Sequence, residues 1–420
     1  MRARAGEVVV FGLIVAGLLG ILVGLVLTVG ALGNPERVTL VVVAQLATVL
    51  IVLFTLLAIV VLTLVWLERK QLARMQGRVG PTRVGPFGLL QPVADALKLV
   101  MKEDVAPGTS SKLLFFVAPL LVFVPGFVVW LTIPFARDVV VRSLDMGLFF
   151  FIAVSVLSIV GLVLAGWSSG SKYAVLGGIR AAAQLISYEI PIIMTVLTVA
   201  MLADSMSFVV VVEAQRTVPF IVIQPLGFIV FFVAGLAEVG RTPFDVYSAE
   251  SEIVGGPFVE YSGAHWAIFF LAEYVNTFVI GAVAALLFLG GWSWPFGDLP
   301  AAAGVALFLG KTYLVVMMIF WVRATYPRLR IDQLMSLGWK VLIPLSFAVV
   351  VATAMQLFYE WPRWTLPVMS LAVLAVPVVM QLRMGRRRAL AEARRYAERA
   401  VVVEAQPRPQ RPQEPQEAGA

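Results

Sequence analysis

The sequence predicts an all-α fold, a polytopic transmembrane helix bundle with about ten spans and long cytoplasmic loops. Hydrophobic residues make up 60% of the 420 residues and charged residues only 14%, and the mean hydropathy is +0.94. Soluble domains are about 45–50% apolar and about 25% charged, so a water-soluble fold of this length could not bury so much apolar surface. The expected solvent is therefore lipid.

Apolar runs near the ~20 residues that cross a bilayer recur along the chain. The first run follows Arg2 and Arg4 and is too long for a typical signal peptide, so we expect it to be retained as a helix. The candidate spans are residues 8–32, 39–67, 113–135, 147–166, 185–204, 217–237, 265–290, 302–322, 339–359 and 365–382.

Loop charges predict the orientation of these spans. With a cytoplasmic N-terminus, most of the 32 Lys and Arg residues fall on the cytoplasmic side, as the positive-inside rule requires. Both termini are then cytoplasmic. The exceptions are Arg37, Arg137, Arg142, Arg216 and Arg363 in the opposite loops, and Lys311 within a span.

The residue types in the chain also exclude several kinds of cofactor site. The absence of cysteine excludes disulfides, iron–sulfur clusters and thiolate zinc sites held by this chain, and the single histidine, His265, argues against a haem or a multi-histidine metal centre. We expect no metal or redox cofactor on this chain.

The first long cytoplasmic loop, residues 68–104, begins with Glu68, Arg69 and Lys70 directly after a span. Its Gly80-Pro81 and Gly85-Pro86 pairs predict rigid turns at the membrane surface rather than a phosphate-binding loop, because no GK[ST] motif follows. The next segment, LLQPVADALKLVMKE, has the pattern of an interfacial amphipathic helix.

The second long loop, residues 236–263, is acidic at the membrane boundary. It carries Glu238, Asp245, Glu250, Glu252 and Glu260 against one basic residue, and apolar residues are interleaved with them. Crowded, partly desolvated carboxylates have raised and coupled pKa values, which suits proton transfer near neutral pH. We favour proton handling over a partner-docking surface or a divalent-cation site.

Three ionisable residues lie inside the predicted spans: Glu189, Glu273 and Lys311. Such residues are costly in a bilayer and are functional candidates by default. The last cytoplasmic segment, residues 322–344, contains arginines whose planar guanidinium groups suit fixed ion pairs, so we expect it to pair with an acidic loop or a partner subunit.

Together these strings resemble the quinone-site membrane subunit of respiratory complex I. The motifs are ERKQLARMQGRVGPTRVGPFGLLQPVADALKLVMKE, RAAAQLISYE, AEVGRTPFD, VEYSG, AEY and RATYPRLRIDQLMSLGWKVLIPL, in the family's order over about residues 39–359. The resemblance implies an eight-helix core (39–359), a quinone chamber walled by the cytoplasmic loops, and a carboxylate path leading into the membrane. It leaves outside that core an extra N-terminal helix and loop (1–38), an extra C-terminal helix (360–383), and a basic helix with a disordered Pro/Gln-rich tail (384–420).

The resemblance also implies a location, the inner (cell) membrane of a bacterium, and roles for particular residues. Quinone is the expected substrate, and FMN and iron–sulfur clusters are expected in partner subunits, one of which would place a cluster beside the quinone. The expected proton path comprises Glu68, Glu189, Asp245, Glu250, Glu252, Glu273 and Lys311. The expected quinone-binding residues are Arg69, Gly80, Arg83, Gly85, Pro86, Phe87, Leu89, Gln91 and Arg241. The expected partner-docking residues are Asp95, Lys98, Arg323, Arg328, Arg330 and Asp332.

Two positions depart from the family pattern, which usually has glutamate at Ser248 and asparagine at Gly240. The first departure removes one carboxylate from the expected path. Two alternative functions stay open at this point: the equivalent subunit of a related dehydrogenase or hydrogenase complex with another electron donor, and a stand-alone ion-coupled transporter.

Overall fold

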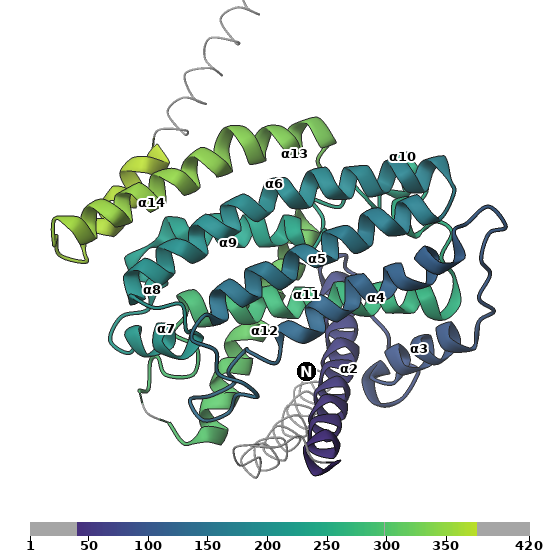
Figure 1. Cartoon of the computed structure of the whole chain (residues 1–420), viewed down its shortest axis with the longest axis horizontal. Coiled ribbons are helices and arrows are strands. Elements are labelled where there is room, and N and C mark those ends of the chain that lie inside the picture. The colour runs from purple at the N-terminus through teal and green to yellow at the C-terminus, as the bar shows by residue number, and fades with distance from the viewer. Residues whose placement is uncertain (1–39, 298, 376–420) are drawn as a thin grey trace, which may run out of the picture. The chain divides into compact units, whose positions relative to one another are not determined.

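A computed structural model of the chain describes residues 40–297 and 299–375. These residues fold into helices joined by loops, which confirms the predicted all-α class (Figure 1). The helices are α2 (Leu40–Met75), α3 (Gln91–Met101), α4 (Lys112–Val129), α5 (Gly147–Ser168), α6 (Lys172–Ala203), α7 (Phe208–Ala214), α8 (Phe220–Ile223), α9 (Pro225–Glu238), α10 (Glu250–Ile253), α11 (Gly263–Phe288), α12 (Ala301–Thr325), α13 (Ile331–Leu337) and α14 (Ile343–Phe358).

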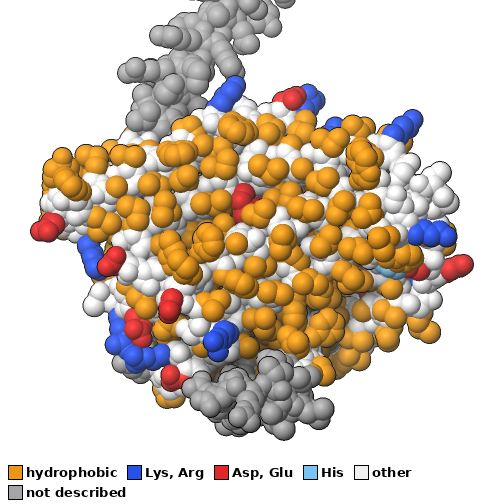
Figure 2. All heavy atoms as spheres, in the orientation of Figure 1, with side chains coloured by type: hydrophobic (Ala, Val, Ile, Leu, Met, Phe, Trp, Pro, Cys, Tyr) orange, Lys and Arg blue, Asp and Glu red, His pale blue; other side chains and the backbone are white. Residues whose placement is uncertain are grey.

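Seven helical segments of the described residues are long and apolar enough to cross a membrane. Six are α2, α4, α5, α6, α11 and α12, and the seventh joins α13 to α14 through a π-helical turn at Gly338–Leu342. Hydrophobic side chains cover most of the face seen in Figure 2, and most charged side chains lie near its margins. This distribution fits a protein whose lateral surface contacts lipid.

Several predicted boundaries are wrong. The helix that contains the span predicted at 185–204 begins at Lys172. The prediction missed its first turns because they are rich in Gly and Ala and have low hydropathy. The span predicted at 217–237 is broken at Gln224 into α8 and α9, since a proline disfavours helical backbone angles in the residue before it. The span predicted at 8–32 lies outside the described residues, and only Thr365–Ala375 of the last span is described.

Helices α5, α6 and α9 run side by side, and α4 packs against both α5 and α11 (Figure 1). Glycines allow the closest approaches. A β-carbon at Gly161 would lie 2.6 Å from the Val122 side chain, and one at Gly166 would lie 2.5 Å from the Ala174 carbonyl oxygen. Small residues at helix contacts are typical of membrane proteins, because they let the backbones pack tightly. Helix α2 crosses these helices steeply and contacts α11 and α12, where the site described next is found (Figure 1).

Candidate functional site

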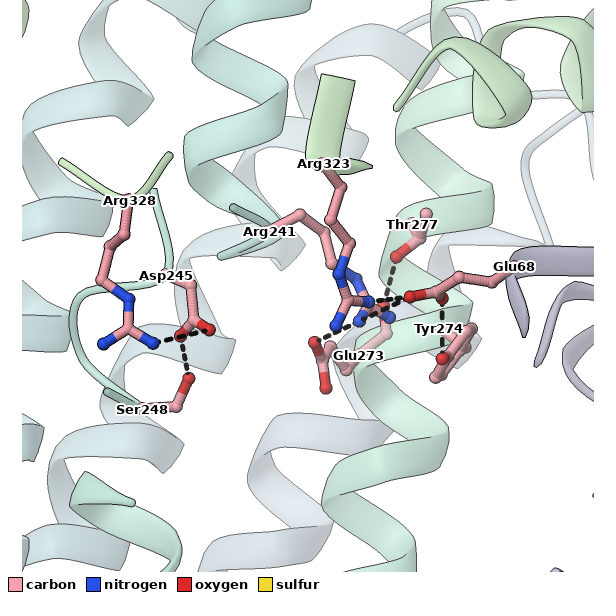
Figure 3. A network of polar contacts seen from close by, with 9 residues as sticks. All are labelled: Glu68, Arg241, Asp245, Ser248, Glu273, Tyr274, Thr277, Arg323 and Arg328. Carbon is pink, nitrogen blue, oxygen red and sulfur yellow. Dashed lines mark hydrogen bonds and ion pairs between the residues drawn. The ribbon is translucent and has the colours of Figure 1, made fainter. Parts of the chain in front are cut away.

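Four charged side chains from separate segments meet in a buried ring (Figure 3). Glu68 of α2 pairs with Arg323 of α12, and its other carboxylate oxygen accepts a 2.8 Å hydrogen bond from the Tyr274 hydroxyl. Arg241 Nη1 lies 3.1 Å from Glu273 Oε1 and 3.8 Å from Glu68 Oε1. The side chains of Glu68 and Arg241 are only 4% and 5% exposed. The side chains of Glu273 and Arg323 are 33% and 29% exposed, so two carboxylates balance two guanidinium groups around a buried Glu68–Arg241 centre.

Helix lengths bring Glu68 and Arg323 into this ring. The sequence predicts that the first core span ends at residue 67 and that Arg323 belongs to a cytoplasmic loop, whereas the structure has both Glu68 and Arg323 on helices. Helix α2 continues to Met75 and α12 continues to Thr325, so both residues project from helices toward the ring. The polar residues that end the apolar runs are thus still helical.

Arg241 is enclosed on every side. Its guanidinium carbon lies 4.4 Å from the centre of the Tyr274 ring, and its Nε and Nη2 atoms have no hydrogen-bond partner among the described residues. Burial alone would lower the pKa of Arg241, but Glu273, Tyr274 and Tyr247 together outweigh it and raise that pKa above its usual value. The side chain is therefore a permanent cation in the ring.

A second cluster lies in the acidic loop (Figure 3). The Ser248 hydroxyl donates a hydrogen bond to Asp245, and Arg328 approaches the same carboxylate at 3.9 Å. Arg328 also donates a 3.1 Å hydrogen bond to Ser251. Burial, together with the negative charges of Glu273 and Asp245, raises the pKa of Tyr247 well above its usual value, so this phenol stays neutral.

The other acids of the predicted proton path lie apart from the ring. Glu250 and Glu252 are exposed on α10, where Glu252 forms a 2.6 Å ion pair with Arg180 of α6. Glu189 is buried in the middle of α6 and accepts a 3.0 Å hydrogen bond from Ser155. The structure thus separates a surface pair of acids from the buried ones.

Glu238 is a partly buried acid that the site prediction omitted. The sequence marks it only as one charge of the acidic loop, whereas in the structure it is the last residue of α9 and faces the same small cavity as Glu189. One carboxylate oxygen of each has no hydrogen-bond partner among the described residues. The cavity measures about 30 Å³, about the volume of one water molecule. In the sequence, the position of Glu238 at the end of an apolar run was the available signal for a role of this residue.

Three cavities follow one another through the protein. The largest, about 1040 Å³, lies between α2, α3 and α11 and is lined mainly by apolar side chains. A second, about 570 Å³, is lined by Arg241, Glu273 and Arg323 of the ring and by the Asp245 cluster. Trp266 and Phe270 line both cavities. The second cavity shares Ser158, Glu238 and Asn276 with the small cavity beside Glu189. Side chains shared between adjoining cavities therefore connect the carboxylates of the second and third cavities to the large apolar cavity.

The predicted quinone-binding residues divide into two groups. Arg69 and Gln91 line the largest cavity, and Arg241 lines the second. The remaining residues belong to the surface turn before α3 and are not among the residues that line these cavities, although Pro81 of that turn lines the largest one. They are Gly80, Arg83, Gly85, Pro86, Phe87 and Leu89.

Asp95 ties α3 to α2 at the rim of the largest cavity. Its carboxylate pairs with Arg69 at 2.5 Å, accepts a 3.2 Å hydrogen bond from Gln91, and lies 3.7 Å from Lys98. Burial raises the pKa of Asp95, but the hydrogen bond and positive charge of Arg69 outweigh that effect and lower the pKa below 3.8. Of the remaining predicted docking residues, Arg330 and Asp332 are exposed at the start of α13.

Lys311 lies apart from all of these acids. Its ammonium group donates to the carbonyl oxygens of Leu289, Gly291 and Trp294 at 2.6, 2.7 and 2.6 Å. An ammonium group has three protons to donate, so all of them are engaged in the loop after α11. Within the described residues, no group of three or more His, Cys, Asp or Glu side chains could hold a metal ion.

Known proteins similar to this chain carry names of the same enzyme. A sequence model described as NADH dehydrogenase matches residues 47–354. The chain is 48% identical over 313 residues to the H subunit of NADH-quinone oxidoreductase from Dehalococcoides mccartyi strain CBDB1, covering 74% of this chain and 87% of the relative. It is 51% identical over 288 residues to the protein of the same name from Geobacillus kaustophilus strain HTA426, covering 68% and 86%.

Proposed function

Because this chain belongs to the NADH dehydrogenase family, as the H subunit of NADH-quinone oxidoreductase, we propose that its largest cavity admits quinone and that its buried ring couples quinone reduction to proton translocation. The chain is a membrane component of this enzyme complex, and the other subunits are its partners. We further propose that NADH is the electron donor, and that FMN and the iron–sulfur clusters, including one beside the quinone, belong to those partners. Both termini would face the cytoplasm.

The size and lining of the largest cavity support quinone binding. Ligand pockets typically measure about 300–1,000 Å³ and combine apolar walls with a few polar groups. Here Val61, Val65 and Leu271 are among the apolar wall residues, while Arg69 and Gln91 provide polar groups. The apolar wall suits a polyprenyl tail, and the polar groups suit a quinone head group.

The observation that carries the coupling proposal is the position of two neighbouring residues on α2. Arg69 lines the largest cavity, whereas its neighbour Glu68 pairs with Arg323, which lines the second cavity. Adjacent residues of a helix point in directions about 100° apart, so one turn of α2 presents Arg69 to the largest cavity and Glu68 to the ring. A change at Arg69 when quinone is reduced can therefore reach Glu68 without a long relay.

The charge balance of the ring makes it responsive to a proton. Each buried charge is tolerable only while it is paired, and removing one charge leaves its partner unmatched. Protonation of Glu273 would leave Arg241 with Glu68 as its remaining partner among the ring carboxylates, 3.8 Å away. One protonation thus changes the interactions of the whole ring, and Glu238 and Glu189 lie along the next cavities.

A cavity-filling variant tests the quinone site. Ala267→Trp places a large ring in the largest cavity, and we expect it to raise the quinone KM at least tenfold in the assembled complex while electron transfer from NADH to ferricyanide is unchanged. Leu314→Trp, at a 56% exposed position of α12, is the matched control. Unchanged quinone kinetics in an assembled Ala267→Trp complex would contradict the proposal.

Carboxylate variants test the coupling. We expect Glu273→Gln to reduce quinone reduction and proton translocation together, because the ring loses one of its two negative charges. Glu260→Gln, further along the acidic loop, is the milder comparison. Parental pumping in an assembled Glu273→Gln complex would show that the ring has no part in coupling.

A further inference from the structure

The turn before α3 contains an aromatic residue in a backbone conformation that aromatic residues rarely adopt. Phe87 has φ 55° and ψ 21°, between Gly85 at φ 70° and Gly88 at φ 77°. Glycine accepts these angles freely, whereas in a bulky L-residue they are a genuine outlier. Strained residues persist only where their surroundings restrain them, and they gather at functional sites.

One buried side chain supplies that restraint. Trp66 of α2 is 2% exposed, and its indole Nε1 donates a 3.2 Å hydrogen bond to the carbonyl oxygen of Phe87. The ammonium group of Lys70, one turn further along α2, lies 5.7 Å from the centre of the indole ring. The bond therefore ties the strained residue itself, rather than a neighbour, to a rigid membrane helix.

The position of this turn affects the rim of the largest cavity. Gly88 packs so closely on Pro81 that a β-carbon at Gly88 would lie 2.2 Å from the Pro81 carbonyl oxygen. Pro81 lines the cavity, and so do Val65 and Arg69, which precede and follow Trp66 on α2. A shift at Phe87 is thus passed to the cavity rim through backbone contacts.

We propose that Trp66 is a positioning residue for quinone binding, because its indole hydrogen bond holds the strained turn at Phe87 and thereby shapes the rim of the largest cavity. The proposal rests on the proposed quinone function of that cavity. Trp66 is not among the residues that line the cavity, so it acts through the turn and not by touching quinone. Electron transfer itself takes place at a partner's cofactor, so the effect belongs to KM and not to kcat.

The chain provides a matched control for removal of an indole N–H group. Trp130 is fully buried and stacks on Phe278 at 4.9 Å, but its Nε1 has no hydrogen-bond partner among the described residues. Trp66→Phe and Trp130→Phe therefore make the same chemical change in a buried place, and only the first removes a hydrogen bond.

The experiment compares these two variants in the assembled complex in native membranes. For Trp66→Phe we expect quinone KM to rise about three- to tenfold, because that factor corresponds to the loss of one hydrogen bond. We expect kcat to be unchanged. We also expect faster amide exchange at Gly88, Leu89 and Leu90, whose N–H groups bond within the turn. Trp130→Phe should change neither quantity.

Unchanged KM and unchanged amide exchange in Trp66→Phe would overturn the proposal. If Trp66→Phe does not assemble, benzothienylalanine at position 66 replaces the N–H group by sulfur at nearly constant shape and tests the same bond. The Ala267→Trp variant separates the two levels of inference. If it raises KM while Trp66→Phe does not, only the role of Trp66 is wrong, whereas no effect of Ala267→Trp rejects the quinone cavity itself.

Discussion

Replacement of Glu68 by glutamine tests the buried ring most directly. Glutamine keeps an oxygen that can accept the 2.8 Å hydrogen bond from Tyr274, but it removes the charge that pairs with Arg323 and Arg241. Removing one partner of a buried ion pair costs about 3–5 kcal/mol. The Arg323 side chain is 29% exposed and Arg241 keeps Glu273 at 3.1 Å, so we expect the lower end, about 3 kcal/mol.

The assay is a double-mutant cycle on the midpoint of thermal inactivation of the purified complex. A loss of about 3 kcal/mol should lower the midpoint by about 3 °C in a chain of this length. Adding Arg323→Gln to Glu68→Gln should recover about 2 kcal/mol of that loss, because it removes the guanidinium left without its partner. Adding Arg241→Gln should recover nothing, because it leaves Glu273 without a cation. Additive effects of Glu68→Gln and Arg323→Gln would refute the reasoning, since two residues that interact cannot be independent.

Four further outcomes are expected. Lys311→Met should lower the midpoint of thermal inactivation by several degrees, because three carbonyl oxygens lose a charged donor, while protons pumped per electron in the surviving complex stay at the parental value. Gly88→Ala should abolish assembly, measured by native gel, since its β-carbon would lie 2.2 Å from a backbone oxygen at positive φ. Asp245→Asn should assemble normally and lower quinone reductase activity and pumping together by at least fivefold. The ion pair between Arg69 and Asp95 lowers the folded-state pKa of Asp95, so it should stabilise the complex fully above about pH 5 and lose this contribution as the pH falls below 3.8. Asp95→Asn should remove this acid dependence from the midpoint of thermal inactivation.

Hydropathy predicted the helical class and most of the spans because the thickness of a bilayer imposes a minimum apolar length. It did not predict the first part of α6, because Gly177, Gly178 and Ala181 pack against other segments outside any long apolar run. The break at Gln224 also went unpredicted, although Pro225 was the available signal. Apolar length indicates where a helix crosses the membrane, whereas its ends depend on tertiary packing.

The candidate site was predictable in its members but not in its arrangement. Ionisable residues at membrane depth stand out in any sequence, and on this ground Glu189 and Glu273 were predicted. Glu68, directly after a span, was predicted from the family resemblance. Which acid meets which arginine depends on how α2 crosses α11 and α12, and no local pattern encodes that crossing. For the same reason Lys311 was grouped with the acids, although in the structure its donors are directed at the loop after α11.

The ring of Glu68, Arg241, Glu273 and Arg323 also bears on the biogenesis of the protein. As the chain emerges from the ribosome, α2 enters the bilayer with a carboxylate whose hydrogen-bonding partner Tyr274 lies 206 residues further along. Its ion-pair partner on α12 is synthesised later still. Until then Glu68 must remain protonated, face water or be shielded by an insertion factor, and a chain truncated before α12 would present membrane quality control with an unpaired polar group. Closure of the ring therefore marks the moment when the last helix of the site has been placed.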